Sequence, residues 1–239
     1  PARRLRKAVI PAAGFGTRLF PATKAVKKEL FPVIGRDGRA KPAILAIVEE
    51  ALAAAVEEVA IVTQPGDRAL FERFFHEPPP IEHWQKLSPA DQEYARQLAD
   101  LGRRVTVVEQ AQQEGFGHAV WCAREWVGDE PFLLMLGDHL YASDLAAACA
   151  RQLVEEFERT GRSVVGLATA PVAESRHFGC VTGVWESGRR LAISEFIEKP
   201  DPDYAREHLR VEGLEDGRVL TLFGQYALTP RIFSLLDEN

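Results

Sequence analysis

Short apolar runs that alternate with helix-type patterns are the feature that most limits how this 239-residue chain can fold. The runs that we expect to be strands are 5–11, 59–63, 105–109, 132–136 and 164–169. The helical patterns between and after them cover 41–55, 67–75, 89–101, 117–127 and 144–159. Strands that alternate with helices form a parallel sheet. The sequence therefore predicts an α/β fold, a Rossmann-like open and mostly parallel sheet flanked by helices.

The last third of the chain has a different pattern. Residues 178–185 and 191–197 alternate in polarity around a turn at 186–189, which predicts an antiparallel pair of strands. Another strand is expected over 219–228, and Pro230 is suited to the start of a final short helix. We expect one domain over 1–239, with a first half at 1–170 and a second, antiparallel half at 171–239. Residues 77–88 include three consecutive prolines and predict an irregular surface segment.

Composition excludes several kinds of protein. The net charge of −6 argues against a nucleic-acid partner, which usually requires a basic face. No apolar run reaches the roughly 20 residues that span a bilayer, so no membrane association is expected. The three cysteines are far apart in sequence and form no CxxC pair, which favours a reducing compartment and a cytoplasmic protein.

The distribution of charge indicates a ligand. The first 28 residues contain no carboxylate, and Glu29 is the first acidic residue of the chain. The cations that precede it are Arg3, Arg4, Arg6, Lys7, Arg18, Lys24, Lys27 and Lys28. An acidic protein with one cationic stretch is better suited to a small anionic ligand than to a long polyanion.

A glycine pair, Gly14 and Gly16, follows the first predicted strand. It begins like the dinucleotide fingerprint G-x-G-x-x-G, but Leu19 replaces the third glycine and Pro21 prevents a helix from starting directly afterwards. A P-loop requires a Gly-Lys pair, which this sequence lacks. A structural turn and a phosphate-binding loop remain. Four cations between Arg18 and Lys28 without a neighbouring acid favour the phosphate-binding loop.

Residues 7–34 closely resemble the signature of bacterial UTP–glucose-1-phosphate uridylyltransferases, which belong to the sugar-phosphate nucleotidyltransferases. The pattern A-G-x-G-T-R-x-x-P-A-T-K-x-x-x-K-E-x-x-P is matched at every fixed position from Ala13 to Pro32. The resemblance continues through Lys41-Pro42, Gln110, 115–120, 127–131, 136–138, 178–181, 198–200 and 224–228. It covers nearly the whole chain.

The resemblance implies a glycosyltransferase-A-like fold and the transfer of a uridylyl group from UTP to glucose 1-phosphate, giving UDP-glucose and pyrophosphate with the help of Mg²⁺. Lys28-Glu29 points to UTP, because thymidylyl relatives usually carry glutamine after the lysine. Three alternatives remain open: a related enzyme that uses dTTP or another NTP, a catalytically weak nucleotide-sugar-binding homologue, and a dinucleotide-dependent oxidoreductase.

The resemblance also assigns residues. The groups expected to take part in catalysis are Arg18, Lys28, Asp138 and Lys199, with Asp138 as the metal ligand. The nucleotide should be held by Ala12, Ala13, Gly14, Gly16, Thr17, Glu29, Gln110 and Gly115. Within that set, Glu29, Gln110 and Gly115 should read the uracil edge. The sugar phosphate should be held by Gly179, Glu198, Lys199 and Tyr226.

Each assignment has a simpler alternative. Asp138 could close a turn after Gly137, Glu198 and Lys199 could be a surface ion pair, and His118 could be structural. The role of His139 stays open, and the insertion at 36–40 could alter access to the base. Relatives continue beyond the equivalent of Asn239 with a second metal-associated aspartate, so we expect this chain to be truncated and the full-length enzyme to be a homo-oligomer.

Overall fold

The computed structural model describes residues 4–35 and 37–238. Arg3, and Arg36 of the insertion, lie outside the described residues. The chain forms two compact units, one made of Pro1–Val164 with Tyr226–Asn239 and the other of Val165–Gln225. The resemblance predicts a nucleotide-binding half at 1–170 and a sugar-phosphate-binding half at 171–239, and this division by ligand stays a prediction.

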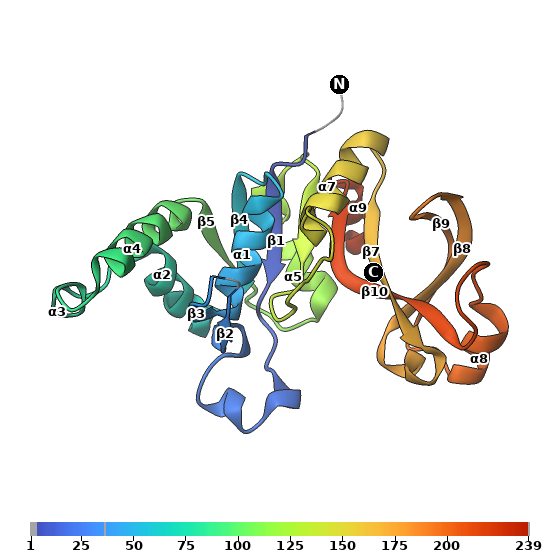
Figure 1. Ribbon diagram of the computed structural model, residues 1–239, viewed down its shortest axis with the longest axis horizontal. Coiled ribbons are helices and arrows are strands. Elements are labelled where there is room, and N and C mark those ends of the chain that lie inside the picture. The colour runs from blue at the N-terminus through green and yellow to red at the C-terminus, as the bar shows by residue number, and fades with distance from the viewer. Residues whose placement is uncertain (1–3, 36, 239) are drawn as a thin grey trace. The chain divides into compact units, whose positions relative to one another are not determined.

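The first unit is built on a parallel sheet (Figure 1). Its strands are β1 (Lys7–Pro11), β4 (Glu58–Thr63), β5 (Val105–Glu109) and β6 (Phe132–Met135). Their order is β5-β4-β1-β6, with β10 (Arg218–Leu228) next to β6. In the central register, Val9 lies opposite Ala60 on one side and Leu134 on the other. The predicted parallel α/β architecture is confirmed.

Alternation along the strands assigns the two faces of this sheet. Ala8 and Ile10 of β1 belong to one buried cluster, whereas Val9 between them belongs to another. The first cluster is covered by α1 (Ala43–Ala53), α2 (Arg68–His76) and α7 (Cys149–Thr160), with α4 (Pro89–Gly102) packed against α2. The second is covered by α5 (Phe116–Cys122), α6 (Arg124–Val127) and α9 (Arg231–Asp237). Both faces are therefore buried, which explains the continuous apolar sequence of the strands.

The second unit is largely antiparallel. Strands β8 (Gly179–Ser187) and β9 (Arg190–Glu198) form the predicted hairpin, and β8 also pairs antiparallel with β10. Strand β7 (Val164–Pro171) pairs with β10 from outside this order. The unit also contains α8 (Pro202–His208), which begins after the capping carboxylate of Asp201.

Several elements differ from the sequence-based expectation. The helix predicted over 117–127 is divided into α5 and α6 at Ala123, and the helix predicted over 144–159 begins only at Cys149. There the Glu50 carboxylate accepts a hydrogen bond of 2.9 Å from the Ala150 amide, so α1 caps the start of α7. The segment predicted as irregular contains the short helix α3 (Ile81–Trp84).

Two short strands, β2 (Pro32–Ile34) and β3 (Ala40–Pro42), were not expected from the sequence; they form a separate antiparallel pair. The predicted helix over 41–55 accordingly starts two residues late, at Ala43. Over the described residues, no helix is both long and apolar enough to cross a membrane.

Candidate functional site

The glycine loop starts at the carboxyl end of β1 and is anchored to β4. The Ala12 amide donates a hydrogen bond of 2.7 Å to Val62 O, and Gln64 Nε2 donates one of 2.6 Å to Ala13 O. Ala12 and Ala13 are buried, whereas Gly14 is exposed. Ligands of open α/β sheets bind at this edge. Gln64 was missed in the sequence analysis, and its position directly after a strand is the signal that could have found it.

Gly16 shapes the loop. Its φ of +66° is left-handed, and a Cβ there would lie 2.8 Å from Thr23 Cγ2. Thr23 Oγ1 in turn donates a hydrogen bond of 3.0 Å to Gly16 O. Only glycine meets both conditions without strain. The loop is thereby folded back onto the segment that contains Lys28, whose Cδ would be 3.3 Å from the same Cβ.

Lys28 connects the loop to Asp138. Its Nζ lies 2.7 Å from Asp138 Oδ2 and 3.5 Å from Glu29 Oε1, although Lys28 and Asp138 are 110 positions apart. A Cβ placed on Gly14 would be 3.5 Å from the same ammonium. The structure therefore brings together the glycine loop, Lys28 and Asp138 at the carboxyl ends of β1 and β6.

The expectation that the four loop cations lack compensating acids is wrong for two of them. Lys27 Nζ lies 2.7 Å from Asp67 Oδ2, and Lys28 is paired with Asp138. The acids come from distant parts of the sequence, which a local count of charges does not detect. Arg18 and Lys24 are exposed and form no ion pair with any of the described residues.

Glu29 is completely buried. Within the described chain, neither carboxylate oxygen accepts a hydrogen bond. Burial raises the pKa of Glu29 to about 7, against the opposing charges of Lys27 and Lys28. Its Cγ lies near Gly137, where an added Cβ would be 3.4 Å away. In this arrangement the carboxylate faces the protein interior, so a base edge would reach it only after a rearrangement.

Asp138 is ionised at neutral pH. Partial burial alone would raise its pKa, but the hydrogen bond and charge of Lys28 outweigh burial and hold the pKa below its usual value. The described residues include no group of three or more His, Cys, Asp or Glu side chains that could hold a metal ion. One carboxylate suits Mg²⁺ when phosphate and water oxygens complete the shell. The donor chemistry of Asp138 therefore fits Mg²⁺ only together with a phosphate ligand.

Gln110 and Gly115 lie on the neighbouring strand connection. The Gln110 amide donates a hydrogen bond of 2.8 Å to Thr63 O, at the end of β4. Its buried side chain donates one of 3.0 Å from Nε2 to Gly115 O. Gly115, with φ of +101°, immediately precedes α5. Gln110 and the glycine loop thus both contact the carboxyl end of β4.

The residues expected to hold the sugar phosphate are divided between the two units. In the second unit, Gly179 pairs with Glu198, and a Cβ on Gly179 would be 3.0 Å from Glu198 Oε2. Lys199, with φ of +50°, donates its amide to Phe178 O at 3.0 Å, and its Nζ lies 3.2 Å from Glu198 Oε1. Both side chains of that ion pair are more than half exposed. Tyr226 belongs to the first unit, where it packs against the buried hydrophobic cluster that α5, α6 and α9 cover.

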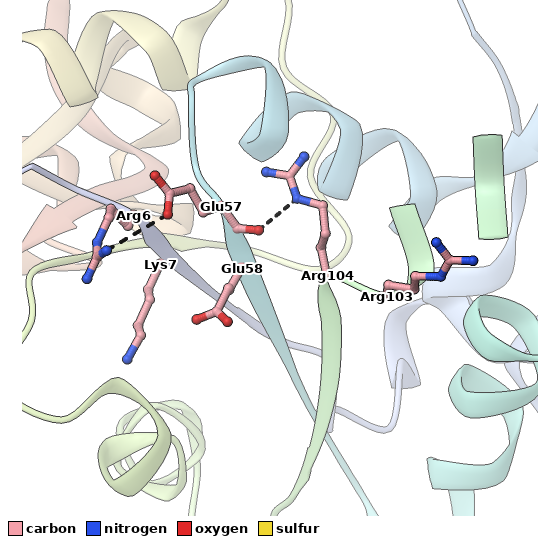
Figure 2. A pocket seen from close by; sticks show the side chains of 6 residues that line it. All are labelled: Arg6, Lys7, Glu57, Glu58, Arg103 and Arg104. Carbon is pink, nitrogen blue, oxygen red and sulfur yellow. Dashed lines mark hydrogen bonds and ion pairs between the residues drawn. The ribbon is translucent and has the colours of Figure 1, made fainter. Parts of the chain in front are cut away.

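Figure 2 shows a pocket of about 360 Å³ at the opposite edge, at the amino ends of β1, β4 and β5. Its lining residues are Arg6, Lys7, Glu57, Glu58, Arg103 and Arg104. Arg6 pairs with Glu130 at 2.9 Å, and Arg104 donates to Glu57 O at 2.7 Å. Because its cations are largely held by the protein's own acceptors, this pocket offers little to a phosphate.

A parallel α/β sheet with a glycine loop and a lysine–aspartate pair at its carboxyl edge places this molecule among the phosphoryl-handling α/β proteins, and comparison makes the class definite. The chain belongs to the nucleotidyl transferase family, which matches residues 7–238. The resemblance found in the sequence is confirmed.

Individual relatives of this chain have names more specific than that of the nucleotidyl transferase family. A UTP–glucose-1-phosphate uridylyltransferase of Bacillus subtilis is 35% identical over 241 residues, covering 99% of this chain and 75% of the relative. A second such protein, from Staphylococcus saprophyticus, is 37% identical over 238 residues, covering 98% and 75%. A crystal structure of UDP-glucose pyrophosphorylase complexed with UDP-glucose matches with a TM-score of 0.78 at 29% identity, covering 98% of this chain and 80% of that one. A UTP-bound UGPase from Acinetobacter baumannii matches with a TM-score of 0.75 at 27% identity, covering 98% and 77%.

Proposed function

We propose that this chain transfers a uridylyl group from UTP to glucose 1-phosphate, giving UDP-glucose and pyrophosphate, in the cytoplasm. The observation that carries the proposal is that the glycine loop, Lys28 and Asp138 lie together at one edge of the sheet, within the residues that match the nucleotidyl transferase family. The names of its relatives support the choice of both substrates. Cys122 and Cys180 form no disulfide with any of the described residues, which agrees with a reducing compartment.

In the proposed reaction, a phosphate oxygen of glucose 1-phosphate attacks the α-phosphorus of UTP in line. The new P–O bond forms as the bond to the β-phosphate oxygen breaks, and pyrophosphate leaves with that electron pair. No protein nucleophile is needed, so orientation and charge neutralisation account for the rate. Arg18, exposed and without an ion pair among the described residues, is available to the triphosphate.

Asp138 would hold Mg²⁺ together with phosphate oxygens and water, and the metal would supply Lewis-acid stabilisation of the transferred group. Lys28 would exchange its present partner, Asp138, for the triphosphate. That exchange requires only that the flexible Lys28 side chain reorient, because its ammonium already lies beside the glycine loop. A Cβ placed on Gly14 would be 3.5 Å from Lys28 Nζ.

The remaining residues take the predicted roles in this proposal. The backbone of Ala12, Ala13 and Gly14, with Gly16 and Thr17, would line the nucleotide. Gln110 and Gly115 would read the base, and Glu29 would contribute from beneath the loop. Gly179, Glu198 and Tyr226 would hold sugar hydroxyls, and Lys199 would bind the sugar's phosphate.

The test is a pyrophosphate-release assay with UTP, glucose 1-phosphate and MgCl₂, repeated with dTTP, CTP and GTP. We expect turnover with UTP and at least tenfold lower kcat/KM with the other nucleotides. Preference for dTTP would replace UTP in the proposal. Binding of UDP-glucose without turnover would identify a nucleotide-sugar-binding homologue, and binding of NADH alone would support the oxidoreductase.

A further inference from the structure

The side-chain amide of Gln110 is held at its nitrogen end. Nε2 lies 3.0 Å from Gly115 O and 3.1 Å from His118 Nδ1. Because a carbonyl oxygen can only accept hydrogen bonds, the atom that faces Gly115 O must be the NH₂ group. Because the amide group is planar, the position of Nε2 also determines the position of Oε1. No described residue donates a hydrogen bond to Gln110 Oε1, and that atom is not among the fully buried polar atoms without a partner.

His118 supplies the second acceptor only in one tautomer. The proton must be on Nε2, so that the lone pair of Nδ1 faces Gln110 Nε2–H. The surroundings of the other ring nitrogen favour this arrangement, because His118 Nε2 lies 3.7 Å from a carboxylate oxygen of Glu114 and 3.7 Å from Cys122 Sγ. A proton on Nε2 faces these two acceptors.

A second carbonyl competes for the same nitrogen. Gln112 O lies 2.9 Å from His118 Nδ1 and would prefer a proton there. At 2.9 Å this carbonyl would repel the lone pair of an unprotonated Nδ1, so the tautomer with the proton on Nε2 requires the exposed Gln112 carbonyl to turn toward water. Gln110 is only 2% exposed, and a buried N–H without an acceptor costs about 1–3 kcal/mol. The balance favours Nδ1 as the acceptor for Gln110.

We propose that His118 is a positioning residue that sets nucleotide specificity by holding Gln110 with its oxygen free to accept a hydrogen bond from the base. This inference rests on the proposed function. Uracil offers a donor, N3–H, whereas N3 of cytosine is an acceptor. An amide oxygen therefore matches uracil and repels cytosine, and a rotated amide would reverse that preference.

Packing by the His118 ring can be tested separately from its hydrogen bond. It stacks on Trp121, with ring centroids 5.8 Å apart and planes inclined by 24°. His118→Phe keeps an aromatic ring for this contact but removes Nδ1. His118→Asn removes the stack but provides a side-chain oxygen at a similar distance from the helix backbone. The two substitutions therefore separate packing from hydrogen bonding.

The experiment measures kcat and KM for UTP and CTP with glucose 1-phosphate and MgCl₂, for the wild type and both variants. We expect His118→Phe to lower the UTP/CTP ratio of kcat/KM about tenfold, the value of one hydrogen bond of about 1.4 kcal/mol. The change should come from a higher KM for UTP, with kcat within about threefold. His118→Asn should restore most of the ratio. Cys122→Ala is the control, because the Cys122 thiol lies beside Nε2 of His118 and not beside Nδ1, and it should leave the ratio unchanged.

The outcomes distinguish the two proposals. If the wild type releases no pyrophosphate from UTP, the proposed function fails. If the wild type is active and His118→Phe keeps the UTP/CTP ratio within twofold, the role of His118 is refuted while the function stands. A fall in kcat alone, or a loss of the ratio that His118→Asn does not restore, also refutes it. Melting temperatures measured for all variants establish that each is folded before its kinetics are compared.

Discussion

Lys28 lies next to two carboxylates whose pKa values are shifted in opposite directions. Asp138 is ionised and paired with it at 2.7 Å, whereas Glu29 is buried without a hydrogen-bond partner among the described residues and has a pKa of about 7. The ammonium is thus already placed beside the loop before any ligand arrives. At the scale of single residues, the arrangement predicts separate effects of the three side chains on turnover and on stability.

Loss of either member of the ion pair should remove most of the activity. We expect Lys28→Ala and Asp138→Ala each to lower kcat/KM by about 10²–10³-fold, because each removes charge stabilisation of the transferred phosphoryl group. Pyrophosphate release under saturating MgCl₂ measures this, and circular dichroism checks the fold. Lys86→Ala, an exposed lysine on the unit's surface, is the matched control. Losses below tenfold for either residue would remove it from the proposed catalytic set.

Glu29 predicts a dependence of stability on pH. Its pKa is about 7 in the folded protein and near 4.5 in the unfolded chain, so between these values the folded state holds the proton more tightly. The contribution of Glu29 to the free energy of unfolding should therefore fall as pH rises from about 4.5 to about 7, by roughly 3 kcal/mol, and stay constant above. Urea unfolding of the wild type and Glu29→Gln at pH 5 and pH 8 measures the difference. Equal differences between the two proteins at both pH values would contradict the assignment.

How far single residues can be predicted depends on where their partners lie. Lys28 and Asp138 were assigned from motifs, but their contact joins positions 110 apart, and only the rule that ligands bind at strand carboxyl ends brings them near each other. The burial of Glu29 was not foreseen, because a charged residue in a polar loop is normally exposed. Gly137 comes beside it only in the folded sheet, where a Cβ on Gly137 would be 3.4 Å from Glu29 Cγ.

At the scale of elements, Gly137 controls how closely the end of β6 approaches β1. A Cβ at Gly137 would be 2.7 Å from Pro11 O, a backbone atom that cannot rotate away. We expect Gly137→Ala to lower the free energy of unfolding by about 1–3 kcal/mol and to reduce activity, since Asp138 is the next residue. Urea unfolding and the pyrophosphate assay measure the two effects.

Gly66→Ala is the matched control for this prediction, because a Cβ there has nothing within 4 Å. It should change the free energy of unfolding by less than about 0.5 kcal/mol. Similar stability of both variants would show that the end of β6 can move aside at little cost.

The elements predicted well were those with enough length for a pattern. The four parallel strands and the β8–β9 hairpin were found because apolar runs or alternation extend over several residues. Strands β2 and β3 have three residues each and include prolines, so no period can be recognised. Helix α8 was missed although Asp201-Pro202 is a recognisable start signal, a capping carboxylate followed by a proline at the first position.

At the scale of the whole molecule, the chain leaves and re-enters its first unit through strands. β7 starts at the last residue of the first segment, Val164, and β10 carries the chain from Gln225 back to Tyr226. The residues proposed to bind the nucleotide all lie in the first unit. Of those proposed to bind the sugar phosphate, Gly179, Glu198 and Lys199 lie in the second unit and Tyr226 lies in the first.

Nucleotide binding should stabilise the folded protein. At a concentration of UTP and MgCl₂ a hundred times the Kd, we expect a gain of about 2.7 kcal/mol and a rise in Tm of roughly 5–10 °C. CTP at the same concentration should give a smaller rise, and NADH none. Differential scanning fluorimetry measures these shifts. A larger shift with NADH than with UTP would contradict the nucleotide assignment.

The stack of His118 on Trp121 has a practical consequence. An indole in contact with an imidazole has an emission that depends on that ring's position and protonation, and Trp121 lies three residues after His118 along α5. Intrinsic fluorescence can therefore follow events at the Gln110 amide, which is proposed to read the base, without an added dye. The difference spectrum between the wild type and Trp121→Phe isolates this signal from those of the other three indoles.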